Sequence, residues 1–278
     1  MKMLIRLCLF FFIASPVFAA GWKLVWSDEF DKPGLPDPAK WNYETGFIRN
    51  HEAQYYTRDR KENARVENGM LIIEARKEPF RNPAYDPAAT NSRNWNRSRA
   101  FAAYTSASLT TRDRASWIYG RIEVRAKLPA GRGVWPAIWT LGTNIPQAGW
   151  PACGEMDIME MVGFKPEMIY AHVHTRKFDV LQKADQGNGI KIPDASDAFH
   201  VYAVEWDAEH MDFFVDGQKY FTYRNEKTGA DAWPFDKNQY LIINLAIGGD
   251  WGGQQGIDDS IFPQRFYIDY VRVYQKQP

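Results

Sequence analysis

Cysteine is almost absent from this chain of 278 residues, which contains only Cys8 and Cys153. Cys8 lies in an N-terminal segment that we expect to be removed, so the remaining domain has no internal disulfide. Cys153 has no recognisable histidine partner on an activating helix, and we interpret it as a packing residue, not as a nucleophile. About 260 residues can bury a large core without covalent cross-links.

An excess of one charge is also absent. The chain has 34 Lys and Arg against 34 Asp and Glu. Removing residues 1–19 takes away Lys2 and Arg6 and no acid, which leaves 32 bases against 34 acids, a net charge of −2. This balance offers no basic patch that could follow phosphates, so we expect no nucleic-acid partner.

Apolar residues form a long run only near the N-terminus, from Leu4 to Ile13. Basic residues flank its start, and Val17-Phe18-Ala19 offers small residues at the spacing of a cleavage site. This layout predicts a secretory signal peptide over residues 1–19, because the run is too short to span a bilayer. No later segment could serve as a membrane anchor, so we expect a secreted or periplasmic protein, and we expect it to be a monomer.

Long amphipathic helical patterns are missing too, and period-two alternation takes their place. It runs from Ile122 to Leu128, and similar strand patterns occupy 69–76, 199–206, 211–215, 218–223, 240–247 and 266–273. Asp216-Gly217 separates two of these patterns with a dipeptide suited to a tight hairpin. Many strands with almost no helix predict one all-β domain over residues 20–278, a jelly-roll sandwich of two antiparallel sheets.

Aromatic residues, in contrast, are abundant, at 15% of the chain with 11 tryptophans. Some belong in the core because aromatics favour strands, but sugar rings stack on exposed indoles, which gives a first indication of the ligand. Trp135 and Trp139 are four residues apart and share one face of a strand. Pro136 lacks a backbone N–H, so we expect that strand to lie at a sheet edge or to be bulged.

The segment from Gly154 to Gly163 has the pattern of a strand that carries three carboxylates, although acids are rare in strands. Glu155 and Asp157 are two residues apart and project from the same face. Glu160 would face the opposite way in a regular strand. We therefore predict a β-bulge at Ile158-Met159 that returns Glu160 to the shared face.

Three adjacent acids repel one another, which costs stability unless they serve a function. Glycoside cleavage with retention needs two carboxyl groups about 5–5.5 Å apart, one as nucleophile and one as proton donor. We assign Glu155 as the nucleophile, Glu160 as the acid/base and Asp157 as the group that orients the nucleophile. On this pattern alone a solvated outer face and a calcium site remain open alternatives.

Further segments occur in a characteristic order along nearly the whole expected mature chain: 26–30 (WSDEF), 119–126 (YGRIEVRA), 133–139 (GVWPAIW), the acid strand, 244–249 (NLAIGG) and 268–274 (IDYVRVY). Together they resemble glycoside hydrolase family 16, most closely its laminarinase-like branch of endo-β-1,3-glucanases. The resemblance implies a jelly roll with a concave substrate cleft and a covalent glycosyl-enzyme. It implies the same roles for Glu155, Asp157 and Glu160, with Met159 as the extra residue of the bulged branch.

The resemblance also implies contacts with the substrate. Trp135 and Trp139 resemble tryptophans that line the cleft. Asn50 and Glu52 resemble polar contacts beside the cleavage point, although Ala53 stands where the family usually shows a glutamine.

Two further positions follow from the resemblance and the strand pattern. His174 resembles a histidine near the catalytic acids, and alternation places His172 on the same face, as the weaker candidate. Trp251 is expected on a loop at the edge of the cleft.

A structural calcium is implied as well, on the convex side away from the cleft. Glu29, the carbonyl of Gly69 and Asp269 fall at the matching positions, and hard oxygen ligands suit calcium. We expect no cofactor to be required for catalysis, and the sequence has no His/Cys cluster for zinc.

We therefore predict a secreted, retaining endo-β-1,3-glucanase that acts on laminarin-like β-glucan polysaccharides, with mixed β-1,3/1,4-glucans as further substrates. The first alternative is a hydrolase of the same fold that prefers lichenan or a marine galactan such as agar, carrageenan or porphyran. The second is a non-catalytic carbohydrate-binding jelly roll, which would be expected to have lost one of the acids. A transglycosylase shares the covalent step and is hardly separated from a hydrolase by sequence.

Overall fold

The computed structural model describes residues 21–89, 92–178 and 186–277. The predicted signal peptide over residues 1–19 therefore lies outside the described residues. Among the residues described, no helix has the length and apolar character needed to cross a membrane.

Strands dominate the residues that the structure describes, and the helices there are short, with at most six residues. The elements are β1 (Trp22–Asp28), β2 (Asn42–Glu44), β3 (Gln54–Tyr56), β4 (Ala64–Glu67), β5 (Met70–Arg81), η1 (Ser92–Arg97), β6 (Phe101–Ser106), β7 (Ser108–Thr110), β8 (Gly120–Lys127), β9 (Val134–Gly142), α1 (Ile145–Ala148), β10 (Glu155–Glu160), β11 (Met168–His174), β12 (Gln186–Lys191), β13 (His200–Trp206), β14 (His210–Val215), β15 (Gln218–Arg224), β16 (Gln239–Ile247), α2 (Gly249–Gly252), η3 (Asp259–Ile261) and β17 (Gln264–Lys276).

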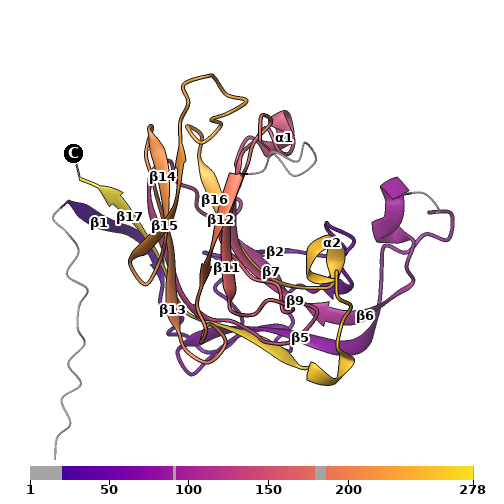
Figure 1. Ribbon diagram of the computed structural model, residues 1–278. Coiled ribbons are helices and arrows are strands. Elements are labelled where there is room, and N and C mark those ends of the chain that lie inside the picture. The colour runs from indigo at the N-terminus through magenta and orange to yellow at the C-terminus, as the bar shows by residue number, and fades with distance from the viewer. Residues whose placement is uncertain (1–20, 90–91, 179–185, 278) are drawn as a thin grey trace, which may run out of the picture.

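These strands form two sheets packed face to face (Figure 1). The larger has ten strands in the order β15-β14-β13-β8-β17-β5-β6-β3, with β1 on β17 and β4 on β5. The smaller has seven strands in the order β12-β11-β10-β9-β16-β7-β2. The prediction of an all-β sandwich of two sheets is therefore confirmed.

One pairing departs from the predicted antiparallel arrangement. Gln54–Tyr56 of β3 pairs with Tyr104–Ser106 of β6 in parallel. The chain makes a long excursion between these strands through β4 and β5, and a crossover of that length allows two strands to run the same way.

Alternation of side chains separates the core from the outer face of the seven-stranded sheet. In β11, Ile169, Ala171 and Val173 are fully buried in the main core cluster. Tyr170 and His172 between them are only half-buried and face the other side. Because side chains alternate along a strand, the apolar residues fix the register, and the register places the polar residues of the sheet on one outer face.

Two local predictions can be compared directly with the structure. Asp216 and Gly217 have φ of 50° and 79°, so the β14–β15 hairpin has the tight turn expected of this dipeptide. The expectation of an edge strand around Pro136 is wrong, because β9 lies between β10 and β16. The irregularity is in the neighbouring strand, where the β9–β10 register shifts between Asp157 and Met159.

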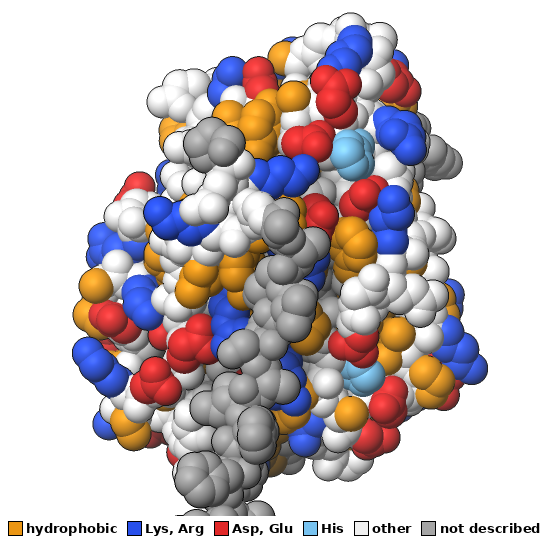
Figure 2. Space-filling model, turned by 90° about the vertical axis from the view of Figure 1, so that its left-hand side faces the viewer, with side chains coloured by type: hydrophobic (Ala, Val, Ile, Leu, Met, Phe, Trp, Pro, Cys, Tyr) orange, Lys and Arg blue, Asp and Glu red, His pale blue; other side chains and the backbone are white. Residues whose placement is uncertain are grey.

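The face of the molecule on the β1 and β14 side carries both signs of charge. On the part of this face that is not behind grey atoms in Figure 2, Lys and Arg side chains are interspersed with Asp and Glu side chains. Interspersed charges of this kind favour solubility without creating a large field of one sign.

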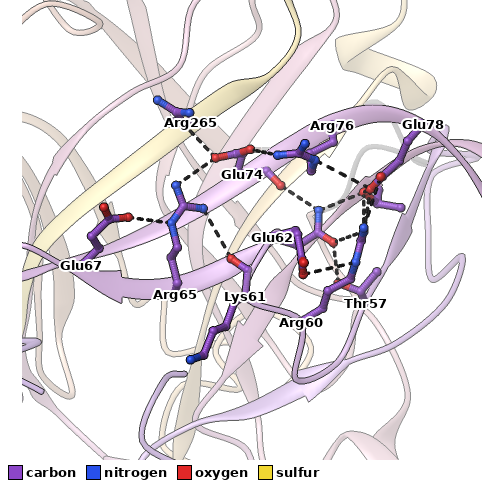
Figure 3. A network of polar contacts seen from close by, with 12 residues as sticks. Thr57, Arg60, Lys61, Glu62, Arg65, Glu67, Glu74, Arg76, Glu78 and Arg265 are labelled. Atoms are coloured by element: carbon purple, nitrogen blue, oxygen red, sulfur yellow. Dashed lines mark hydrogen bonds and ion pairs between the residues drawn. The ribbon is translucent and has the colours of Figure 1, made fainter. Parts of the chain in front are cut away.

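A network of ion pairs joins β4, β5 and β17 of the larger sheet (Figure 3). Glu74 is 1% exposed and accepts hydrogen bonds from Arg65 (3.0 Å), Arg265 (2.9 Å) and Arg76. Burial alone would raise the pKa of Glu74, but the hydrogen bonds from Arg265 and Arg65 outweigh it and hold the pKa below its ordinary value. Three strands are thus tied to one ionised carboxylate.

Replacing Glu74 tests this network. Glu74→Gln keeps the size and removes the charge that three arginines share, so we expect the free energy of unfolding at pH 7 to fall by about 1–3 kcal/mol. Urea denaturation measures it, with the exposed Glu67→Gln as a control that changes stability by less than about 0.5 kcal/mol.

The pH dependence of the same variant gives a second readout. A lowered pKa in the folded state stabilises above the unfolded pKa, and this contribution is lost as the pH falls through the folded pKa. The difference between wild type and Glu74→Gln should therefore shrink in acid. A difference that is constant from pH 7 to pH 3 would contradict the ion-pair account.

Candidate active site

A bulge in β10 brings three carboxylates to one face of the smaller sheet. Glu155 and Asp157 pair with Leu141 and Trp139 of β9, but Glu160 pairs with Ala137, one residue out of register. The β10–β11 pairing shifts over the same interval. Ile158 and Met159 are consecutive, and both are fully buried. The predicted bulge is therefore confirmed, and because two neighbours point into the core, Glu160 returns to the side of Glu155.

Two histidines of β11 lie directly against these acids. His174 Nε2 is 3.1 Å from Asp157 Oδ2 and 4.0 Å from Glu155 Oε1. His172 Nδ1 is 2.8 Å from Glu160 Oε2. The sequence pointed to His174 and ranked His172 lower, but His172 has the shorter contact with a carboxylate. Asp157 is 2% exposed and Glu160 8% exposed, so these charges interact largely away from water.

The pKa values of the three acids shift in different directions, because burial and mutual repulsion raise them while the histidines lower them. Burial first, and the charge of Asp157 second, raise the pKa of Glu155 to about 8. Burial and the charge of Glu160 raise the pKa of Asp157 as well. Burial would also raise the pKa of Glu160, but the hydrogen bond and positive charge of His172 outweigh it and lower this pKa.

Both histidines respond to the acids in the opposite sense. Burial alone would lower their pKa values, but the hydrogen bond and charge of Asp157 raise the pKa of His174 to about 10. Glu160 likewise raises the pKa of His172. The positive charges of the two histidines therefore compensate part of the negative charge of the cluster.

Indole N–H groups complete the hydrogen bonds of the two glutamates. Trp135 Nε1 donates to Glu160 Oε1 at 3.0 Å, and Trp150 Nε1 donates to Glu155 Oε2 at 2.7 Å. Trp150 was not among the predicted site residues. It follows α1 and is 41% exposed. In the sequence, the signal that could have identified it was a tryptophan a few residues before the strand that carries the acids.

Trp251 lies beside this group, but on a short helix where the sequence predicted a loop, and its contact with substrate remains a prediction. It belongs to α2 and its ring makes edge-on contacts with Trp135 (5.6 Å), Tyr170 (5.3 Å) and His172 (5.6 Å). Gly249 of α2 is favoured here, since its φ is 76° and a Cβ would lie 2.9 Å from the Asn50 carbonyl oxygen. A compact aromatic cluster therefore surrounds Glu160.

The segment from Asn50 to Glu52 fastens α2 in place. The Asn50 carbonyl accepts from the Asp250 amide at 2.9 Å, and the His51 ring contacts the Asp250 carboxylate at 3.1 Å. The Asn50 side chain is exposed, whereas Glu52 is 2% exposed and accepts from Gln54 at 2.7 Å. Burial raises the pKa of Glu52 to about 7. Both predicted residues thus adjoin the aromatic cluster, and substrate contact remains a prediction for each.

Trp139 is placed differently from Trp135. It is 6% exposed, and its N–H donates to Asn244 at 2.7 Å. The guanidinium of Arg49 stacks over its ring at 4.7 Å, and Arg49 also pairs with Glu44. The ring face is therefore covered by Arg49, a residue that the sequence did not single out. A sugar approaching Trp139 would meet this guanidinium.

The predicted calcium ligands have other partners in the structure. Both oxygens of Glu29 accept from Arg272, at 2.9 and 2.8 Å. Asp269 Oδ2 accepts from Arg125 at 2.5 Å. Because arginines already neutralise both carboxylates, the side chains as they lie here do not fit a calcium site with the Gly69 carbonyl. Calcium binding remains a prediction.

Metal donors do converge at the acids. Among the residues that the structure describes, Glu155, Asp157 and His174 lie within 4.8 Å of one another, and so do Asp157, Glu160 and His172. Such donors can hold a divalent ion, but the ion pairs between them already account for their proximity. Cys153 beside them is buried, which raises its thiol pKa to about 11 and agrees with a packing role.

Three carboxylates on one sheet face, two of them bonded to indole N–H groups, fit a carbohydrate-cleaving enzyme, a glycoside hydrolase. The comparison with known proteins agrees with this class. The model of the family described as glycosyl hydrolases family 16 matches residues 51–272, and the chain belongs to this family.

Several relatives align over almost the whole chain. The β-glucanase of Rhodothermus marinus is 49% identical over 92% of this chain and 86% of its own. The X-ray structure of the laminarinase from Rhodothermus marinus superposes with a TM-score of 0.83 at 47% identity, covering 92% of this chain and 98% of that one. SCLam, a non-specific endo-β-1,3(4)-glucanase from the same family, has a TM-score of 0.82 at 44% identity and covers 93% of each chain. The chain is thus similar throughout to β-glucanases and laminarinases.

The bulge can be tested through Met159. In a regular strand Met159 would share the face of the acids, but here it is fully buried in the core. Met159→Gln should therefore lower the free energy of unfolding by about 2–4 kcal/mol, because an amide would be buried without a partner.

Met168→Gln, on the acid-facing side of β11, is the matched control and should cost less than about 1 kcal/mol. Chemical denaturation measures both variants. Equal and small losses would mean that Met159 is not in the core and that the bulge is misplaced.

Proposed function

We propose that this protein is a secreted, monomeric endo-β-1,3-glucanase that hydrolyses laminarin-like β-glucans with retention of configuration. The observation that carries the proposal is the return of Glu160 to the face of Glu155, on either side of Asp157. An oxygen of Asp157 lies within 4.8 Å of a carboxylate oxygen of Glu155, and an oxygen of Asp157 lies within 4.8 Å of one of Glu160, so the three acids form one cluster. The similarity of the chain to a laminarinase supports a β-1,3-glucan as its substrate.

In this mechanism Glu155 must be ionised and Glu160 protonated, the reverse of what the raised pKa of Glu155, about 8, and the lowered pKa of Glu160 favour in the free site, so a proton must move within the cluster when substrate binds. Glu155 then attacks the anomeric carbon while Glu160 gives a proton to the departing glycosidic oxygen. The resulting glycosyl-enzyme is hydrolysed when Glu160, now ionised, removes a proton from the attacking water. Asp157 orients Glu155, and Trp150 holds one of its oxygens through the 2.7 Å hydrogen bond.

Mixed β-1,3/1,4-glucans are a second candidate substrate. The non-specific endo-β-1,3(4)-glucanase that matches this chain over 93% of its length supports this extension. The exposed Trp150 and the Trp135–Trp251 pair offer indole faces beside the acids, and stacking of this kind tolerates different linkages.

Secretion is proposed from the N-terminal pattern of residues 1–19. The basic start, the short apolar run and the small residues before Ala20 have the layout of an export signal. A fusion of residues 1–25 to a reporter that is active only outside the cytoplasm would test this directly.

Product analysis tests the substrate. On incubation with laminarin, lichenan, agarose and carrageenan, the protein should release a ladder of short oligosaccharides fastest from laminarin and next fastest from lichenan. NMR of the first products should show the β-anomer, as retention requires. Binding to laminarin without new reducing ends would instead support a carbohydrate-binding protein, and release from agarose or carrageenan alone would support a galactanase.

The catalytic assignment is tested by Glu155→Gln and Glu160→Gln. Either change should lower kcat on laminarin by about 10³-fold or more, because each removes a bond-making or proton-donating group. With a dinitrophenyl glycoside, whose leaving group needs no proton, Glu160→Gln should still form the glycosyl-enzyme rapidly and Glu155→Gln should not. Equal behaviour of the two variants on this substrate would contradict the division of roles.

A further inference from the structure

Both oxygens of Glu160 accept hydrogen bonds, and the two donors differ in charge. Trp135 Nε1 at 3.0 Å is a neutral donor. His172 Nδ1 at 2.8 Å belongs to a ring that can carry a proton and a positive charge. An acid that must hold a proton before it can donate it is therefore in contact with a second proton-binding group.

The His172 ring is held from several sides. Tyr170 lies nearly parallel to it, with ring centroids 5.9 Å apart and an interplanar angle of 9°, and Trp251 meets it edge-on at 5.6 Å. Gly187 pairs with His172 across the β11–β12 ladder. A Cβ at Gly187 would lie 2.2 Å from Cδ2 of the ring, so only glycine leaves space for it there. The contact with Glu160 is therefore built into the packing.

Charged and titratable groups from three strands surround this pair. Asp157 and Glu155 face it from β10, and His174 and Tyr170 face it from β11. Tyr220 of β15 interacts electrostatically with Glu160 and Asp157.

The neighbours on β9 and α2 are the indoles of Trp135 and Trp251, which do not titrate. Burial alone would lower the pKa of His172, but the hydrogen bond and charge of Glu160 and the charge of Asp157 outweigh it and favour a protonated His172.

We propose that His172 is a positioning residue for Glu160, sharing one proton with it across the Nδ1–Oε2 hydrogen bond and thereby setting the pH range in which Glu160 can protonate the departing sugar. This inference rests on the proposed function, because it assigns the acid/base role to Glu160.

The proton balance of the step is simple. In the resting site the proton is on His172 Nδ1 and Glu160 is ionised, which agrees with the raised pKa of His172 and the lowered pKa of Glu160. When a sugar displaces water, the proton moves to Glu160 Oε2, which leaves a neutral carboxylic acid and a neutral imidazole. The glycosidic oxygen takes this proton as its bond to the anomeric carbon breaks. Glu160 regains a proton from the water that later attacks the glycosyl-enzyme.

The first experiment needs no substrate. Histidine imidazole signals of the full mature chain are followed by NMR from pH 4 to pH 10 in wild type and in Glu160→Gln. We expect the His172 pKa to fall by about one unit or more in Glu160→Gln, since the opposite charge at 2.8 Å is removed. His210 is the internal control. It pairs with Asp207 and lies far along the chain from the acid strand β10. An unchanged His172 titration overturns the proposal.

The second experiment follows the catalytic consequence in His172→Asn, which keeps a neutral N–H donor near Oε2 and removes the positive charge. Without His172 no neighbouring ring can store the shared proton, and Glu160 beside a neutral amide loses its own proton more readily than the pair does, so the basic limb of kcat/KM on laminarin should move to lower pH by about one unit. Turnover of a dinitrophenyl glycoside should stay within about twofold of wild type, because that leaving group needs no proton.

His210→Asn is the matched control and should leave the basic limb in place. Thermal denaturation establishes that each variant is folded. A uniform fall in rate at every pH and on both substrates would overturn the proposal, because a purely structural role would have that result.

The two experiments also separate this inference from the proposed function. If wild type failed to cleave any β-glucan, the proposed substrate would be wrong, but the NMR titration would still decide whether His172 and Glu160 share a proton. If laminarin were cleaved and neither the titration nor the basic limb moved, the function would stand and the role of His172 would fail.

Discussion

One extra residue in β10 is the constraint on which the active site depends. A strand places successive side chains on opposite faces, so two glutamates five residues apart cannot meet in a regular strand. Burying both Ile158 and Met159 resolves this, because the core takes two consecutive side chains and Glu160 returns to the face of Glu155. The hydrophobic packing of the sandwich therefore fixes the position of Glu160, the proposed acid/base, through the register of the strand.

The charge balance of the site follows from that geometry. Three carboxylates gathered on a largely buried face would repel one another strongly, and two histidines from the neighbouring strand lie where their charges offset this repulsion. His174 contacts Asp157 and His172 contacts Glu160, so each histidine is paired with a different acid. The alternation of β11, which buries Ile169, Ala171 and Val173, delivers both rings to the same face. The strand next to the acids thus also influences their protonation.

Much of this arrangement could be predicted from sequence because it depends on parity. Alternating apolar residues identify most strands, and the spacing of Glu155, Asp157 and Glu160 is enough to require the bulge. The contacts that escaped prediction join loop residues to the sheet. Arg49 over Trp139 and Trp150 on Glu155 depend on how loops fold back on the sheet. The prediction of an edge strand at Pro136 was also wrong. A missing N–H suggests a sheet edge, whereas β9 lies inside the sheet and the bulge is in the neighbouring strand β10.

The two glycines of β12 give the sheet an asymmetry in local stability. β12 is the outermost strand at this end of the sheet, and Gly187 and Gly189 lie against His172 and Tyr170. Outer strands with glycine pack few side chains and open at lower free energy than the core. Transient fraying of β12 would free the His172 ring while β9 and β10 remained folded. On heating, loss of β12 would then release the His172 ring before the sandwich itself unfolded.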